Sequence, residues 1–243
     1  MIVVPVIDLK GGLVVRARGG ERRWYRPIET PLALGSKAVD VVCGLMSIYP
    51  FSTLYVADLD AIEGSGDNAS VLTALKEAFP RLRLWVDNGA ANIEAVEAIV
   101  RADWAVPVVG SESQRDVALM RACAPSNQVV LSLDFRQDRF EGPEQLMTET
   151  HLWPMTVIVM TLARVGTTAG PDFARIAAVL HLAGERRIFA AGGVRSRSDL
   201  VKLCEIGAAG ALMATALHDG SVTRADIEWV SQSPRLHEPE QRT

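Results

Sequence analysis

Eight short apolar runs recur along the chain, and they limit what it can fold into more than any other feature. Several are apolar throughout, without alternating polar residues, which is typical of strands buried on both faces of a parallel sheet. Most start roughly 23 to 30 residues apart, about the length that a strand, a loop and a crossover helix require. The runs begin near Ile2, Thr53, Leu82, Ala105, Val129, Val157, Arg187 and Gly210.

The segments between the runs have the pattern of amphipathic helices. In 92–102 an apolar stripe follows Asn92, a residue type that caps helix N-termini. In 196–206, Ser196 and Asp199 have the spacing of a capping box. Strands and helices that alternate in this way predict an α/β fold, either a closed barrel or a doubly wound sheet.

Internal repetition favours the barrel. The stretch LWVDNGAAN at 84–92 aligns with IFAAGGVRS at 188–196, and Asp8 in IDLK aligns with Asp134 in LDFR. Four β–α units that occur twice indicate a single (β/α)8 barrel, a TIM barrel of the phosphate-binding type, built from two half-barrels. The alternative is that any two β–α units look alike.

Length and composition fit one barrel. The chain has 243 residues, of which 49% are hydrophobic, and a (β/α)8 barrel commonly takes ~250 residues as a single domain. We expect the barrel domain to span residues 1–231. The remaining segment, 232–243, is polar and contains two prolines, and we expect it to be a frayed tail.

Charge and residue usage exclude several classes of function. The net charge is -4 and no stretch is strongly basic, so we expect no binding of nucleic acid. No apolar run approaches the ~18 residues of a membrane helix. The three cysteines lack CxxC spacing, which suits a cytoplasmic protein, and the four histidines lack metal-ligand spacing. We therefore expect no metal and no cofactor, and the sequence leaves open a monomer or a small homo-oligomer.

Two aspartates are the candidate catalytic residues. Asp8 and Asp134 each directly follow an apolar run, and active sites of these barrels lie at the C-terminal ends of the strands. Of two facing carboxyl groups, one can stay ionised and accept a proton while burial lets the other keep a proton to donate. A single aspartate after a strand often does no more than cap a helix or order a turn, but the internal symmetry of this pair favours chemistry.

Loops after the sixth, seventh and eighth runs are candidate phosphate ligands. Glycine pairs let backbone N–H groups approach a ligand, and a helix N-terminus adds a favourable dipole. The loops that follow strands seven and eight often bind phosphate in such barrels. The candidates are Gly166, Thr167, Gly192, Gly193, Ala214 and Thr215.

A series of motifs extends these inferences. In order they are VPVIDLKGGLVVRARGG, YVADLDAIEG, LDFR, RVGTTAG, AAGGVRS and ALMATAL. Over nearly its whole length the chain resembles the histidine-biosynthesis barrels. These are the phosphoribosylformimino-aminoimidazole carboxamide ribotide isomerase and the cyclase subunit of imidazole glycerol phosphate synthase. The resemblance implies two catalytic aspartates, matched by Asp8 as general base and Asp134 as general acid of an Amadori rearrangement. Arg16 in VVRA is closer to the isomerase and is a candidate substrate contact.

The resemblance also implies a second phosphate site and substrate-orienting residues. The second site corresponds to Gly89, Gly110 and Ser111, and the orienting residues to Asp58 and Thr161. In the family the two phosphate sites hold a large substrate with two phosphates. For this chain we expect a small phosphorylated substrate.

Three departures from the family pattern all affect the binding of a large substrate. The third strand ends at Asp87 where the family has a glycine triplet, and a carboxylate near a phosphate opposes its binding. Met160 takes the position of a catalytic threonine, so Thr161 would point to the other face of the strand. The fifth loop is short and lacks the tryptophan that covers the substrate in the family, for which Trp24 is a possible replacement.

Three functions remain open. The first is an isomerase acting on a phosphorylated sugar-type substrate by acid–base chemistry of the two aspartates, including the histidine-pathway reaction itself. The second is a paralogue that acts as a lyase or synthase on a smaller monophosphate, similar to isomerase-related proteins of one-carbon cofactor (methanopterin or methanofuran) pathways. The third is a non-catalytic barrel that binds a phosphorylated ligand.

Overall fold

Eight parallel strands close into a barrel in the computed structural model, which describes residues 1–123, 128–167 and 169–232. Closure follows from the pairing of the last strand with the first, in which Ile2 lies opposite Gly210. All eight apolar runs form these strands, as predicted. The strands are β1 (Ile2–Lys10), β4 (Thr53–Asp58), β5 (Arg83–Asp87), β6 (Ala105–Gly110), β7 (Val130–Arg136), β9 (Thr156–Thr161), β10 (Arg187–Ala191) and β11 (Gly210–Met213).

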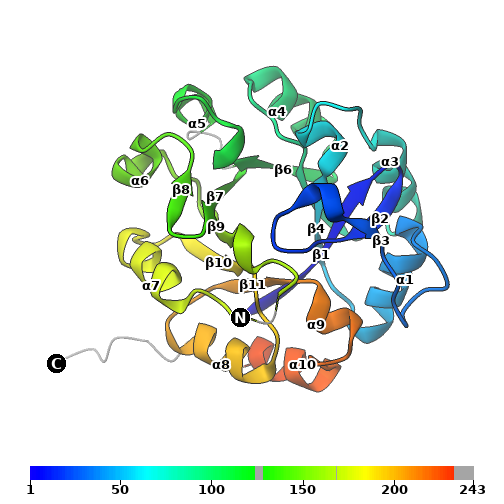
Figure 1. Cartoon of the computed structure of the whole chain (residues 1–243). Coiled ribbons are helices and arrows are strands. Elements are labelled where there is room, and N and C mark those ends of the chain that lie inside the picture. The colour runs from blue at the N-terminus through cyan, green and yellow to red at the C-terminus, as the bar shows by residue number, and fades with distance from the viewer. Residues whose placement is uncertain (124–127, 168, 233–243) are drawn as a thin grey trace.

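Helices surround the barrel as an outer ring (Figure 1). Apolar side chains of the strands that point outward pack against these helices in one large cluster. The longer helices are α1 (Ala38–Ile48), α3 (Ala69–Ala78), α4 (Ile93–Val100), α5 (Ala118–Cys123), α7 (Phe173–Leu182), α8 (Arg197–Glu205) and α10 (Arg224–Gln232). Short helices lie in the loops: α2 (Leu59–Ile62), α6 (Gln145–Thr148), α9 (Thr215–His218), and the 3-10 turns η1 (Arg22–Trp24), η2 (Ser111–Ser113), η3 (Thr150–Leu152) and η4 (Leu162–Arg164).

Three further strands extend the barrel at its mouth and were not predicted. They are β2 (Leu13–Arg16), β3 (Arg26–Pro27) and β8 (Arg139–Glu141). Strand β2 pairs antiparallel with β1, placing Asp8 opposite Val15, and β8 pairs antiparallel with β7, placing Asp134 opposite Glu141. The two hairpins therefore have the same register after the first barrel strand of each half.

Side-chain alternation divides the core into two parts. A second cluster takes members from every barrel strand, among them Val4, Tyr55, Val130, Ile158 and Phe189, and fills the barrel interior. Because side chains of a strand alternate between its faces, residues two positions further along these strands also face inward. This parity decides which polar residues reach the barrel mouth.

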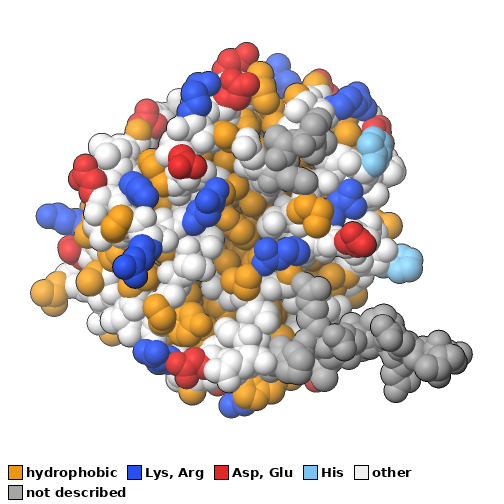
Figure 2. Space-filling model, turned by 180° about the vertical axis from the view of Figure 1, so that it is seen from behind, with side chains coloured by type: hydrophobic (Ala, Val, Ile, Leu, Met, Phe, Trp, Pro, Cys, Tyr) orange, Lys and Arg blue, Asp and Glu red, His pale blue; other side chains and the backbone are white. Residues whose placement is uncertain are grey.

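The expected boundary between the barrel domain, 1–231, and the tail, 232–243, lies next to the end of helix α10. This helix includes Gln232, the first residue of the expected tail, and the rest of the tail lies outside the described residues. The face seen from behind carries interspersed basic and acidic side chains around hydrophobic ones (Figure 2). In the described ranges, no helix has the length and apolar character that crossing a bilayer requires.

Candidate active site

A cavity at the mouth of the barrel brings most of the predicted residues together. Its wall includes both candidate catalytic aspartates and the loops after β9, β10 and β11. The predicted residues that line it are Asp8, Asp134, Gly166, Thr167, Gly192, Gly193, Ala214 and Thr215. Arg16, Asp58, Gly89, Gly110, Ser111 and Thr161 are not part of the wall that the described residues form.

Asp8 and Asp134 lie inside their strands, each two residues before the end, and not directly after an apolar strand as predicted. The reason is that β1 and β7 each continue into an antiparallel hairpin. Both aspartates have the inward parity of Val4 and Val130. They therefore face the cavity from strands one and five of the barrel.

The carboxyl group of Asp134 is fixed by two donors. The Ser132 hydroxyl donates to Oδ1 at 2.7 Å. The Glu112 backbone N–H donates to Oδ2 at 3.1 Å, and the Ser111 hydroxyl oxygen lies 3.3 Å from the same atom. Burial nevertheless dominates and raises the pKa of Asp134 to about 8, helped by the negative charges of Asp87 and Glu112. At neutral pH this group can keep a proton.

Asp8 has a different environment. Burial raises its pKa to about 7, the positive charge of Arg22 opposes that rise, and Asp87 adds to it. Arg22 lies in η1, in the loop between β2 and β3, and also lines the cavity. The Asp8 carboxyl group thus loses its proton at a lower pH than Asp134 does.

A third aspartate, Asp87, ends β5 and faces the same cavity. Its Oδ2 accepts a hydrogen bond from the Tyr55 hydroxyl at 3.0 Å, and its Oδ1 accepts one from the Gly89 backbone at 3.1 Å. Burial raises its pKa to about 6. A side chain at Gly110 would contact both the Asp87 and the Asp134 carboxyl groups, so the two acids approach each other across this glycine.

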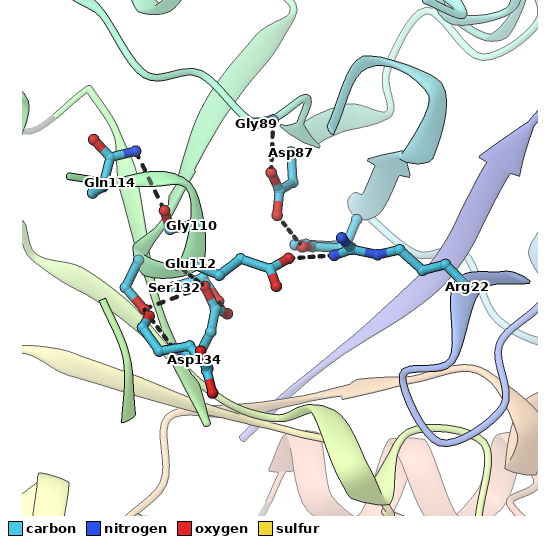
Figure 3. Close-up of polar contacts among 11 residues, drawn as sticks. Arg22, Asp87, Gly89, Gly110, Glu112, Gln114, Ser132 and Asp134 are labelled. Carbon is cyan, nitrogen blue, oxygen red and sulfur yellow. Dashed lines mark hydrogen bonds and ion pairs between the residues drawn. The ribbon is translucent and has the colours of Figure 1, made fainter. Parts of the chain in front are cut away.

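Glu112 adds a fourth carboxyl group to this side of the cavity. It lies in η2 after β6 and forms an ion pair with Arg22, which reaches it from the opposite side of the mouth (Figure 3). The β5/β6 side of the cavity therefore carries two acids, and the arginine next to them is already paired.

The β10/β11 side is lined by backbone and small side chains. Gly192 and Gly193 have φ angles of 96° and 83°, a region that favours glycine. A Cβ on Gly193 would collide with the Gly170 carbonyl. Helix α8 begins just beyond them and is capped by Ser196, whose hydroxyl accepts from the Asp199 backbone at 3.3 Å. This side has the open backbone and the helix N-terminus that anion binding uses.

Arg195 directs its side chain to the helix and not to the cavity. Its Nε donates to Asp199 at 3.0 Å. The pair is half-exposed on the arginine side, and it holds the first turn of α8.

Two residues predicted to orient substrate point away from the barrel interior. Tyr55 and Ala57 face inward, so Asp58 faces outward, where it accepts from the Asn68 backbone and side chain at 2.8 and 2.6 Å. Met160 lines the cavity, and Thr161 is buried on the other face. The one-residue slip inferred from the sequence therefore agrees with the structure.

Residues predicted for a second phosphate site lie around Asp134 and Asp87. Ser111 is fully buried, accepts from the Asp134 backbone at 2.8 Å and donates to the Glu141 carbonyl at 2.7 Å. Its hydroxyl is therefore occupied by the barrel itself. Arg16 is exposed at the end of β2 and lines a smaller adjoining cavity together with His218.

Trp24 does not cover the cavity. Its side chain is 58% exposed and stacks with Arg23. The neighbouring Tyr25 lines the cavity instead. Sequence reasoning placed Asp87 near the second phosphate position but missed Glu112 and Arg22 as lining residues of the cavity.

No group of three or more His, Cys, Asp or Glu side chains in the described part of the chain is arranged to hold a metal ion. The carboxyl groups of Asp134, Asp87 and Glu112 are instead bound by hydroxyl, backbone and guanidinium donors.

Comparison with known proteins gives the family. A family model described as "Histidine biosynthesis protein" matches residues 2–223. An uncharacterized protein of Methanocaldococcus jannaschii is 28% identical over 234 residues, which cover 93% of this chain and 97% of the relative.

Curated isomerases are similar at the same level. They are named 1-(5-phosphoribosyl)-5-((5-phosphoribosylamino)methylideneamino) imidazole-4-carboxamide isomerase. The protein from Pseudomonas fluorescens is 26% identical over 251 residues and that from Pseudomonas aeruginosa 28% identical over 247. Each alignment covers 94% of this chain and 97% of the relative.

Proposed function

The chain belongs to the histidine biosynthesis protein family, and from that premise we propose that it is an isomerase-type enzyme. Its substrate is a phosphorylated sugar-type compound, and Asp8 and Asp134 perform general acid–base catalysis. The observation that carries the proposal is the difference between the surroundings of two aspartates that face one cavity. The names of the curated relatives support the reaction class.

The division of labour follows from the two environments. Near neutral pH Asp8, which is next to Arg22, is the better candidate to be ionised and to take a proton from the carbon next to the reacting carbonyl or imine. Asp134 keeps its proton to a higher pH and donates it to the substrate oxygen. Enolisation then requires no net charge change in the cavity, since one carboxyl group gains the proton while the other gives one up.

The phosphate group of the substrate binds at the β10/β11 side. Backbone N–H groups near Gly192 and Gly193 and the Thr215 hydroxyl are the donors in this proposal. The N-terminus of α8 adds its dipole. The β5/β6 side, with Asp87 and Glu112, holds no phosphate.

That asymmetry favours a second candidate function. A substrate with two phosphates would bring one of them against two carboxylates, which repel it. A smaller monophosphate avoids this conflict. A paralogue that acts as a lyase or synthase on such a compound, after the same enolisation step, is therefore the alternative to the histidine-pathway reaction.

Complementation of a histidine-requiring strain that lacks the isomerase separates these functions. Growth that is abolished by Asp8→Asn and by Asp134→Asn, but kept by the exposed Asp138→Asn control, would support the histidine-pathway reaction. Absence of growth with folded protein in the cell would remove that reaction and leave the alternative. If the two site variants retained the cellular function of the protein, a role by binding alone would replace both.

A further inference from the structure

One residue contacts the surroundings of both aspartates. Glu112 lies in η2, on the loop after β6. Its backbone N–H donates to Asp134 Oδ2 at 3.1 Å. Its side chain pairs with Arg22 across the mouth of the barrel (Figure 3). Asp8 and Asp134 come from opposite sides of the barrel. Glu112 contacts Asp134 through its backbone, and its side chain contacts the arginine whose charge acts on Asp8.

The backbone contact is rigid. Ser111, the preceding residue, is fully buried and hydrogen-bonds the Asp134 backbone and the Glu141 carbonyl. The Glu112 N–H is therefore held in one place. The side-chain charge lies close enough to raise the pKa of Asp134, since it disfavours a second negative charge nearby.

The ion pair between the Glu112 and Arg22 side chains holds the positive charge of Arg22 at the mouth of the barrel. Arg22 and Glu112 are partly buried, with 25% and 20% of their side chains exposed. Arg22 belongs to the loop between β2 and β3, and Glu112 pairs with it from outside that loop. While it is paired, its charge lowers the pKa of Asp8.

We propose that Glu112 is a positioning residue that assigns opposite roles to the two aspartates: its side chain holds Arg22 beside Asp8, and its backbone fixes the Asp134 carboxyl group. Through Arg22 the same acid favours the ionised form of Asp8. The charge of its own carboxylate favours the protonated form of Asp134, and this effect exceeds the opposite effect of its backbone N–H, which donates to the Asp134 carboxyl group. The roles of base and acid rest on the proposed function, whereas the electrostatic coupling does not.

Other titratable groups also lie near the two aspartates and influence their pKa values. Asp8 faces Arg22, Asp87 and the hydroxyl groups of Tyr25 and Tyr55. Asp134 faces Asp87, Glu112 and Tyr55, and Arg136 approaches Tyr25 from β7. Both tyrosines stay protonated, because burial raises their pKa. Asp87 raises the pKa of both aspartates, whereas Arg22 acts on Asp8 and Glu112 acts on Asp134.

Titration of the substrate-free protein tests the coupling. The carboxyl carbons of 13C-labelled aspartates are followed by NMR from pH 4 to 10, with the Asp8→Asn and Asp134→Asn spectra used for assignment. In Glu112→Gln we expect the pKa of Asp134 to fall by about 0.5 to 1 pH unit and that of Asp8 to rise by a similar amount. In Arg22→Met we expect the pKa of Asp8 to rise and that of Asp134 not to fall.

Glu21→Gln is the matched control, because Glu21 forms a more exposed ion pair with Arg23 in the same loop. It should leave both aspartates unchanged. An Asp134 pKa that does not move in Glu112→Gln, or an Asp8 pKa that does not move in Arg22→Met, would overturn the proposal. Because no substrate is present, either result stands even if the proposed reaction is wrong.

With a substrate in hand, the pH profile gives a second readout. In Glu112→Gln we expect the apparent pKa values of the acidic and basic limbs of the kcat/KM profile to lie closer together, because the coupling is lost. A residue that only maintains the fold would lower the rate at every pH and leave the limbs in place.

Discussion

At the scale of single residues, the cavity holds carboxyl groups that lower the stability of the folded protein at high pH. Burial raises the pKa to about 7 for Asp8, about 8 for Asp134 and about 6 for Asp87. In the unfolded chain these groups ionise near pH ~4. Between these values the folded state binds more protons than the unfolded state, so the free energy of unfolding decreases as the pH rises through that window.

Asp134→Asn should therefore stabilise the protein at alkaline pH. The amide keeps the shape of the protonated acid and removes the buried charge, so we expect the free energy of unfolding at pH 9 to rise by about 1 to 3 kcal/mol. Urea denaturation at several pH values measures this. The exposed Asp138→Asn variant is the control, and a loss of stability in Asp134→Asn at pH 9 would show that its ionised form is favoured in the fold.

His218 acts in the opposite direction at lower pH. It is buried, and burial lowers its pKa to about 4. Between about pH 4 and 6.5 the folded state binds fewer protons at this residue than the unfolded state, so its contribution to stability grows as the pH rises. His218 is the same in the Asp134→Asn variant and in the parent protein. The difference in stability between these two proteins at each pH therefore isolates the effect of Asp134.

The sequence was informative where strand position alone decides which residues line the cavity. Asp8 and Asp134 could be placed there because each follows an apolar run. Asp58 also ends one, yet it faces outward, and only strand parity and its distant partner Asn68 show this. Glu112 could not be assigned, because its role depends on Arg22, which is far away in sequence and close only in the folded barrel.

At the scale of elements, two helices show how closely the half-barrels repeat. Asn92 caps α4 with φ and ψ of -146° and 166°, and Ser196 caps α8 with -153° and 164°. Their side chains accept from Ala95 N at 2.9 Å and Asp199 N at 3.3 Å. Both caps were predicted from residue type and spacing.

The similar backbone angles of the two caps predict similar contributions to the free energy of unfolding. We expect Asn92→Ala and Ser196→Ala each to lower the free energy of unfolding by about 1 kcal/mol. The double variant should show the sum, because the caps lie on separate helices. Chemical denaturation measures both effects, and Ser70→Ala, at an exposed position in the first turn of α3, is the control. A cost at only one of the caps would contradict the equivalence of the two elements.

Strands β2, β3 and β8 were missed for a physical reason. Strands β3 and β8 carry charged residues and lack an apolar run, whereas β2 has a run of three apolar residues that follows the apolar run of β1 closely. Their positions depend on pairing with β1, β2 and β7. Because of these hairpins β1 and β7 continue beyond Asp8 and Asp134 to pair with β2 and β8. The two aspartates therefore lie inside strands and not at their ends.

At the scale of the whole molecule, the two half-barrels have similar backbone arrangements but differ in the charges that they present at the mouth. The β10/β11 side of the mouth presents glycines and a helix N-terminus, whereas the β5/β6 side presents Asp87 and Glu112. Repetition of the fold could be predicted from the aligned stretches 84–92 and 188–196. The difference in charge was visible as Asp87 in the same alignment, but its consequence required the position of Glu112 as well.

This charge difference predicts selectivity between ligands with one and two phosphates. We expect a pentose monophosphate to bind the protein at least as tightly as the corresponding bisphosphate in calorimetric titration. Removal of both acids in Asp87→Asn/Glu112→Gln should increase the affinity for the bisphosphate by about tenfold, equivalent to roughly 1.4 kcal/mol, since two repulsive charges are lost and Arg22 gains freedom to contact the anion. Affinity for the monophosphate should change much less, because its phosphate binds on the other side. The double variant Asp138→Asn/Glu97→Gln, which removes two exposed acids, controls for the change in net charge. If the unmodified protein binds the bisphosphate tenfold more tightly than the monophosphate, the carboxylates do not exclude a second phosphate and the two half-barrels are equivalent in binding as well as in backbone.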